Sequence, residues 1–218
     1  MKPSSGRWFW VYLSLDLSKR SAYPMERVNA IVKMTKIIAA IERWGAEFEE
    51  KHIYQSPTGP LLPKVNIGAI EGGAPYRPNY FPGVCSIYVD IRMPPQVRPV
   101  AIKHEMEQAL NALGIDYEFE FYKSLLGYEG KNVEPLVKSA EEIHQHLFGA
   151  KIKVESPDRA SIWTDTNLYN ELGIPAIKIG PRGKRISARN EEIDIDVMVK
   201  AAQLYALMAL DICNRARP

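Results

Sequence analysis

The sequence is poor in cysteine, with only Cys85 and Cys213 in 218 residues. Two cysteines cannot form the disulfide framework that holds small secreted proteins together, so we expect both to be buried thiols in a reducing compartment. The first 15 residues contain a basic residue and an apolar run but no small-residue cleavage site, which argues against a secretory leader. We therefore expect a cytoplasmic protein.

Two further absences narrow the class of function. No apolar run reaches the length that a membrane span needs. The net charge is only +2, and basic residues do not alternate with aromatic ones as they do in a nucleic-acid groove. We therefore expect neither a membrane nor a nucleic acid as a partner. The chain is 46% hydrophobic, which is enough to bury the core of one large or two small domains.

Residues 1–122 alternate between strand and helix patterns. Apolar residues of period two predict strands at residues 7–17, 65–70, 85–93 and 115–121, and helical spacing predicts helices at 28–44 and 97–113. This βαββαβ order is that of a ferredoxin-like sandwich, an α+β fold with a four-stranded antiparallel sheet and two helices on one face. The other face should form a contact surface from Trp8, Trp10, Tyr12, Tyr88, Asp90 and Arg92.

Residues 123–218 have a different character. Helices are expected at residues 133–147, from Thr164 or Asp165 to Gly173, and at 196–214, with a buried strand at 175–179. The last helix should bury one face, made of Met198, Ala201, Ala202, Tyr205, Met208, Ala209 and Ile212. A parallel sheet would need more strands than this, so the second half indicates an incomplete α/β domain.

The loop at residues 72–83 is the unusual part of the first half. It is rich in Gly and Pro, carries Tyr76, Tyr80 and Phe81, and is much longer than a hairpin turn requires. Long, stiffened, aromatic loops commonly bind a ligand or partner, so we regard this loop as a candidate binding element.

Three stretches, in this order, resemble one known family. YPMERVNAI, GAIEGGAPYRPNYFPGVCSIYVDIRMPP and SIWTDTNLYNELGIPAIKIGPRG are similar to segments of the acetylornithine deacetylase and succinyl-diaminopimelate desuccinylase superfamily of zinc-dependent peptidases and amidohydrolases. The resemblance implies that residues 1–122 form the ferredoxin-like lid, which is the family's dimerisation domain. Residues 123–218 would then be the C-terminal part of the α/β catalytic domain.

The departures from the family concern its zinc site. The family's first metal ligands and its Glu general base precede the lid, where this chain has no counterpart, and Ser187 stands near the last His ligand. The lid His aligns with Arg20. His144 and His146 are two residues apart on a helix, so they cannot chelate one ion. We expect no catalytic residue, metal site or cofactor in this chain alone, although the family uses zinc, and a companion chain could carry the metal-binding half.

Some substrate-binding positions persist. The resemblance maps a substrate-contacting Asn onto Asn79 and a carboxylate-binding Arg onto Arg92, and a guanidinium can donate two parallel hydrogen bonds to a carboxylate. The alternatives are an ion pair of Arg92 with Asp90 or Glu118 and a turn-forming role for Asn79. The other candidates align with the lid His or with segments that line the family's cleft: Arg20, Thr164, Asp165, Gly180 and Arg182.

Two function classes follow. One is a member or fragment of the zinc-dependent peptidase and deacylase superfamily that is inactive alone. The other is a non-catalytic dimerisation or small-ligand-binding module derived from that family. In both, we expect residues 1–122 to fold without the rest and a homodimer to form through the strand at 65–70, because acidic residues protect the opposite edge strand. We place the core stripe of the first helix at Val28, Ile31, Thr35 and Ile38, which leaves Met34, Ile37 and Ile41 for the dimer.

Overall fold

A computed structural model describes residues 4–5, 7–16, 29–56, 59–125, 127–154, 164–181, 183–185 and 188–215. The chain forms two compact units, which we call the sheet unit and the helical unit. The sheet unit contains Ser5–Tyr128, and the helical unit contains Glu129–Ser156 and Thr164–Pro218.

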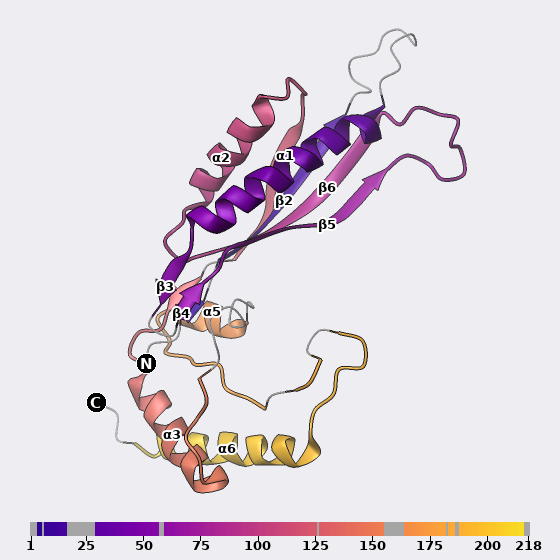
Figure 1. The fold of residues 1–218 in the computed structure, drawn as a ribbon. Helices are drawn as coiled ribbons and strands as arrows, with labels where there is room; N and C mark the ends of the chain where they lie inside the picture. Colours follow the sequence, from indigo (N-terminus) through magenta and orange to yellow (C-terminus); the bar gives the residue numbers. More distant parts are fainter. Residues whose placement is uncertain are drawn as a thin grey trace. The chain divides into compact units, whose positions relative to one another are not determined.

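The sheet unit is an α+β sandwich, as the sequence predicts. Its antiparallel strands lie in the order β5-β6-β2-β7, and helices α1 and α2 cover one face of the sheet (Figure 1). The elements are β2 (Arg7–Asp16), α1 (Ala30–Lys51), β5 (Lys64–Gly72), β6 (Val84–Met93), α2 (Pro99–Asn111) and β7 (Glu118–Leu125). A short ladder of β3 (Tyr54–Ser56) with β4 (Gly59–Leu61) accompanies them. The two-residue strands β1 (Ser4–Ser5) and β8 (Tyr128–Glu129), at the boundaries of this unit, pair with each other.

The central strands β2 and β6 supply the core, because each turns alternate side chains toward the helices. The inward residues are fully buried: Phe9, Val11, Leu13 and Leu15 of β2, and Cys85, Ile87, Val89, Ile91 and Met93 of β6. Helix α2 adds Ile102, Met106 and Leu110, the three buried positions of the predicted stripe. The intervening residues of the strands lie on the other face, which we call the open face.

The buried face of α1 is the reverse of the one expected from the sequence. Met34, Ile37 and Ile41 are fully buried, whereas Ile31 and Val32 are 37% and 58% exposed. Apolar residues occur on more than one side of this helix, so spacing alone does not decide which side meets the sheet. A lysine at position 37 would therefore disrupt the core rather than a dimer.

Helix α1 also continues beyond Trp44, where the sequence pattern ends, to Lys51. Gly45 lies inside this extension, next to β5. A Cβ atom at this position would be 3.1 Å from the Cβ of Val65. Because glycine has no side chain, the helix can lie directly against the edge strand at this point.

The two edge strands of the sheet differ. Among the described strands, β5 pairs with β6 alone, and a bulge between Ile67 and Ala69 shifts its register, so that Ile70 lies opposite the buried Ile87. Ile70 is nevertheless 54% exposed. Strand β7 begins at Glu118 rather than at the predicted residue 115 and carries Glu118 and Glu120 as exposed residues.

The helical unit contains the three predicted helices, α3 (Glu134–Phe148), α5 (Asp165–Glu171) and α6 (Ile195–Cys213), and α3 packs on α6. Residues 175–179 do not form a strand, because no neighbouring strand pairs with them in the described part of this unit. The predicted face of α6 is also largely wrong. Only Ala201 of that set is buried, while Met198 and Tyr205 are 47% and 44% exposed.

Of the remaining members of that set, Met208 and Ile212 are half-buried, and Ala202 and Ala209 are exposed.

Cys85 is buried as expected, but Cys213 is exposed at the end of α6, and both thiols are free. Among the helices that the structure describes, none combines the length and the apolar character that a membrane crossing requires.

Candidate functional site

Arg92 lies on the open face near the end of β6, where Asp90 holds its side chain. The Nε of Arg92 donates to Asp90 Oδ2 over 3.1 Å, and the indole Nε1 of Trp10 donates to Asp90 Oδ1 over 3.0 Å. The Nζ of Lys123 lies 4.3 Å from the centre of the Trp10 ring. The alternative of an Arg92–Asp90 ion pair is therefore what the chain forms, and the pair fixes the orientation of the guanidinium.

Next to this group, four aromatic rings form one cluster on the open face. Ring centres of Trp10 and Tyr122 are 5.7 Å apart, those of Tyr12 and Tyr88 are 5.3 Å apart, and those of Tyr88 and Tyr122 are 6.0 Å apart. The phenol of Tyr88 donates to Glu71 Oε2 over 3.3 Å. Desolvation, followed by the negative charge of Glu71, raises the pKa of Tyr88 above its ordinary value, so the phenol stays neutral and remains a donor.

Asn79 lies in the loop between β5 and β6, where it is exposed. The loop is folded by backbone hydrogen bonds from Arg77 to Ala74 and from Tyr80 to Arg77, and the guanidinium of Arg77 lies 5.6 Å from the Tyr80 ring centre. This loop precedes β6, whereas Arg92 lies near its far end (Figure 1). Eight strand residues span about 26 Å, so one chain does not bring Asn79 and Arg92 onto one small ligand.

Thr164 and Asp165 begin helix α5. The backbone N–H of Thr164 donates to Asn167 Oδ1 over 3.2 Å, and the hydroxyls of Thr164 and Thr166 are 2.6 Å apart. Asp165 is exposed in the first turn, where the helix dipole favours an acid. Both residues thus have a local role in helix capping.

Gly180 lies beside Tyr205 of α6. The Tyr205 hydroxyl donates to the carbonyl of Ile179 over 3.1 Å, and a Cβ atom at position 180 would be 3.0 Å from that hydroxyl. The absence of a side chain at Gly180 therefore permits this contact. Arg20 and Arg182 lie outside the described residues, and substrate binding by any of the seven candidates stays a prediction.

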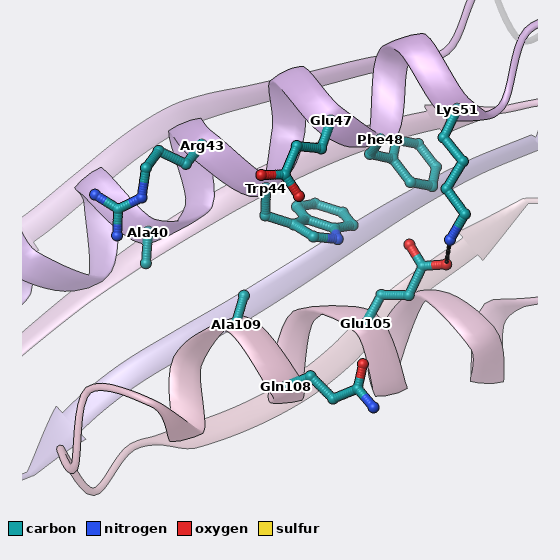
Figure 2. A pocket seen from close by; sticks show the side chains of 9 residues that line it. All are labelled: Ala40, Arg43, Trp44, Glu47, Phe48, Lys51, Glu105, Gln108 and Ala109. Carbon is teal, nitrogen blue, oxygen red and sulfur yellow. Dashed lines mark hydrogen bonds and ion pairs between the residues drawn. The ribbon is translucent and has the colours of Figure 1, made fainter.

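Sequence reasoning missed a groove of about 470 Å³ between α1 and α2 (Figure 2). Its inner wall is aromatic, because the rings of Trp44 and Phe48 lie 5.0 Å apart and face α2. The Nε1 of Trp44 is buried and has no hydrogen-bond partner in the described part of the chain. The lining residues are Ala40, Arg43, Trp44, Glu47, Phe48, Lys51, Glu105, Gln108 and Ala109.

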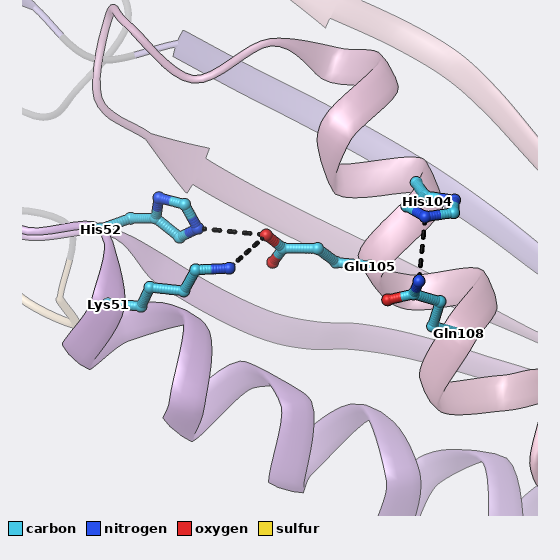
Figure 3. A network of polar contacts seen from close by, with 5 residues as sticks. All are labelled: Lys51, His52, His104, Glu105 and Gln108. Atoms are coloured by element: carbon cyan, nitrogen blue, oxygen red, sulfur yellow. Dashed lines mark hydrogen bonds and ion pairs between the residues drawn. The ribbon is translucent and has the colours of Figure 1, made fainter.

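One end of this groove is closed by a polar network around Glu105 (Figure 3). The ammonium of Lys51 lies 2.7 Å from Glu105 Oε1, and the Nε2 of His52 lies 3.5 Å from the same oxygen. Partial burial alone would raise the pKa of Glu105, but Lys51 and His52 outweigh it and hold the pKa below its ordinary value. The network ties the end of α1 to α2, so its evident role is structural.

The described residues do not fit a zinc ion. No three His, Cys, Asp or Glu side chains among them lie close enough together to bind a metal. A catalytic zinc site needs three protein ligands and a water. No step of a zinc-dependent reaction can therefore be assigned to the residues described above.

Comparisons with known proteins agree with the fold of the sheet unit. Residues 9–118 match the peptidase dimerisation domain of the M20 peptidases. A succinyl-diaminopimelate desuccinylase of Hahella chejuensis (strain KCTC 2396) is 23% identical over 189 residues, which are 84% of this chain and 45% of that protein. The chain thus spans about half the length of this curated relative.

Solved structures of several peptidases have a similar fold. The M20 family metallo-carboxypeptidase Sso-CP2 from Sulfolobus solfataricus has a TM-score of 0.63 at 17% identity, covering 94% of this chain and 58% of that one. Human carnosine dipeptidase 1 has a TM-score of 0.66 at 10% identity, covering 97% and 56%. The aminopeptidase PepT from Bacillus cereus has a TM-score of 0.60 at 18% identity, covering 97% and 53%.

The match over residues 9–118 covers half of the chain and includes most of the βαββαβ elements seen in the sheet unit. The resemblance inferred from the sequence motifs is confirmed by this match and by the desuccinylase relative. The chain belongs to the peptidase dimerisation domain family of the M20 peptidases.

Proposed function

We propose that this chain is the dimerising lid and part of the catalytic domain of a metal-dependent peptidase or deacylase, and that it does not hydrolyse amide bonds alone. The observation that supports this most is the family match over residues 9–118. In addition, no three His, Cys, Asp or Glu side chains of the described residues lie close enough together to bind a metal. Catalysis then requires the metal-binding half from elsewhere, such as a companion chain. The reducing cytoplasm is the location that two free thiols favour.

Metal analysis tests this proposal. The 218-residue chain, dialysed against zinc-free buffer, should retain no stoichiometric zinc and should not hydrolyse N-acylated amino acids or dipeptides. Zinc retained at one ion per chain, or turnover above a buffer blank, would contradict it. If mixing with a chain that carries the family's metal-binding half restores turnover, the chain is part of an enzyme and not a non-catalytic module.

We further propose a homodimer through the edge strand β5. In the part of the chain that the structure describes, this edge is paired on its β6 side alone. Exposed apolar residues flank it, with Ile70 54% and Val32 58% exposed. Two copies could pair antiparallel about a two-fold axis, so that one sheet continues through both subunits. The α1 residues that pack across the axis would be Ile31 and Val32, in place of the buried Met34, Ile37 and Ile41. Such an interface should bury at least about 1,000 Å² in total.

Light scattering measures the assembly directly. The wild type should have twice the 24.7 kDa mass of one chain. Ile70→Lys and Val32→Lys should shift it toward the single-chain mass, because each places a charge at the proposed axis. Val100→Lys is the matched control, since Val100 is 76% exposed on α2, away from β5. A monomeric wild type, or dimers that survive both edge substitutions, would refute this interface.

For the substrate, we propose a ligand with a carboxylate that Arg92 binds, as the acetylornithine-like resemblance implies. Because Asn79 and Arg92 lie at opposite ends of β6, contacts from both to one small substrate would need two copies of the chain. Asn79→Ala and Arg92→Ala chains, mixed and assayed in the assembled enzyme, test this. Mixed dimers should recover part of the turnover that each variant lacks alone. Failure of mixing to restore any turnover would contradict a shared site.

A further inference from the structure

We propose that one exposed side of helix α6 is the surface on which the metal-binding half of the enzyme docks, and that this half presents a β-sheet to it. This assignment rests on the proposed function, because it names the surface through which the two halves of that enzyme would meet. It applies whether the metal-binding half lies on a companion chain or is joined to this one.

Helix α6 has two apolar sides. Its inner side packs on α3 (Figure 1) and contains the buried Ala201 and Leu204. A second group of apolar residues falls within one arc of about 100° on another side of the helix, at 3.6 residues per turn. We call this group the outer stripe, and it consists of Ile195, Val199, Ala202, Ala206, Ala209 and Leu210.

The outer stripe is accessible and carries no charge. Ile195 is 70% exposed, Val199 50% and Leu210 61%, and the alanines between them are also exposed. The charged residues of α6 all fall outside this arc, on the polar side of the helix: Asp196, Lys200 and Asp211. A surface helix normally has one apolar side, whereas a helix that is apolar on two sides is suited to lie between two layers. An uncharged stripe of this length indicates an interaction surface.

The order of side-chain sizes along the stripe suits a flat partner. Ile195 and Val199 stand near one end and Leu210 near the other, with alanines between them. The small side chains allow a neighbouring layer to approach the middle of the helix closely. A helix that lies on a sheet is one of the few stable ways in which layers pack in a domain.

A strand-like run beside α6 points to the same kind of partner. Residues 175–179 lie next to Tyr205, whose hydroxyl donates to the carbonyl of Ile179 over 3.1 Å. On the helix, Tyr205 stands between the inner side and the outer stripe. Ala176 and Ile177 are half-buried, yet the backbone N–H groups of residues 176–179 donate to no other described residue.

Unpaired backbone groups of this kind are satisfied by a neighbouring strand. A sheet could cover the outer stripe and pair with residues 175–179 at once. A second copy of α6 could cover the stripe, but it would leave the run of 175–179 without a partner. The two features together therefore favour a sheet over a second helix.

The metal-binding half is the partner that the comparisons offer. This chain spans about half the length of its curated relative, so the rest of that protein has no counterpart here. In the proposed enzyme, the missing metal ligands belong to that remainder. A domain that has to hold its metal ligands in place next to this chain needs a fixed contact with it, and the outer stripe supplies the apolar area for one.

Calorimetric titration tests the proposal. The probe is the half of the Hahella chejuensis desuccinylase that this chain does not match, produced as a separate chain and added to the full 218-residue chain. One probe should bind per chain. Val199→Lys and Leu210→Lys should each weaken binding at least about tenfold, because each would bury an unpaired charge in the interface.

Two controls accompany these variants. Leu207→Lys makes the same change on the polar side of α6, where Leu207 is 36% exposed, and should leave the affinity unchanged. In the absence of the probe, Val199→Lys and Leu210→Lys should keep the melting temperature and the oligomeric mass of the wild type, because both positions are exposed.

Three results would overturn the docking surface: no binding of the probe, binding that survives both stripe substitutions, or a stripe variant with a lower melting temperature or mass in the absence of the probe. A lower melting temperature would show that the stripe is packed within the chain, and a lower mass that a second copy covers it. Binding that survives both substitutions would leave the proposed function standing. Zinc retained by the chain alone would refute the proposed function whatever the probe does.

Discussion

The orientation of α1 gives the sharpest test of the fold, through the matched pair Ile37→Ala and Ile31→Ala. Both substitutions remove the same atoms and gain the same helix propensity, about 0.4 kcal/mol. They differ in burial, because Ile37 is fully buried under the helix and Ile31 is 37% exposed. The difference in unfolding free energy between them therefore reports which side of the helix meets the sheet.

The magnitude follows from burial. Truncation of a fully buried isoleucine costs about 2–5 kcal/mol, since the cavity adds to the lost transfer free energy. The side chain of Ile31 buries less apolar area, and its neighbours can relax toward solvent. Its truncation should therefore lower the unfolding free energy by about 1 kcal/mol. Val32→Ala, at a 58% exposed position, should be close to neutral.

Urea unfolding followed by tryptophan fluorescence measures these differences, and the buried Trp44 lies on the same helix. The titrations should be run at several protein concentrations, because dimer dissociation would add to the apparent stability. Variants with unchanged slopes can be compared through their midpoints. An equal cost for Ile37→Ala and Ile31→Ala, or a larger cost for Ile31→Ala, would refute the packing of α1 described here.

Three further predictions concern other parts of the chain. Gly72→Ala should cost about 1–3 kcal/mol, because its Cβ would lie 2.9 Å from the Sγ of Cys85; a melting temperature within a degree of wild type would contradict this. Glu105→Gln should cost under about 1 kcal/mol at neutral pH, since Lys51 is well exposed. Because the folded pKa of Glu105 is lowered, that stabilisation is present above its ordinary value of 4.5 and is lost as the pH falls further, so wild type and variant should converge there. An aromatic disulfide reagent should modify one thiol of the native chain quickly, the exposed Cys213, and a second only after unfolding; two fast thiols would contradict the burial of Cys85.

Each of these has a matched control in the chain. For Gly72→Ala it is Gly68→Ala in the same strand, where the nearest atom to the new Cβ is 3.6 Å away. For Glu105→Gln it is Glu107→Gln on the same helix, whose partner Lys103 lies four residues away and does not join two helices. For the thiols it is Cys213→Ser, which should remove only the fast reaction.

The sequence predicts the central strands of the sheet unit and their buried face because every inward position of β2 and β6 is apolar. Val11, Leu13, Val89 and Ile91 all turn inward, and a one-residue slip would expose every one of them. The same alternation predicts the contents of the open face. The alternation of inward and outward residues was therefore the main basis for predicting the sheet.

Helix faces were harder to predict, for two different reasons. Helix α1 has apolar residues on several sides, and only contact with the sheet selects Met34 and Ile37 over Ile31. Helix α6 is apolar on more sides than the described unit covers, so residues such as Met198 and Leu210 stay exposed. Apolar spacing can indicate that a helix face is suitable for burial. Which face is buried depends on the neighbouring element, and the spacing does not identify that element.

The contacts of a candidate site residue could be predicted only where its partner is close in the sequence or lies opposite it in the sheet. The pairing of Arg92 with Asp90, two residues apart on one face of β6, could be anticipated. The groove between α1 and α2 could not be anticipated. Trp44 and Glu105, which line it, lie on different helices and are 61 residues apart in the sequence. The ligand-binding roles of Asn79, Thr164, Asp165 and Gly180 stay predictions.

The two edges of the sheet limit how many copies of the chain can associate. Strand β7 presents Glu118 and Glu120 along its exposed side, and like charges would oppose one another if a second β7 approached. Strand β5 is free of acids between residues 64 and 70, but its bulge at Gly68 confines regular pairing to short stretches on either side. A sheet that can grow at only one of its edges closes after a single pairing event. The sheet unit that would pair through β5 in the proposed dimer therefore resists growth into fibres.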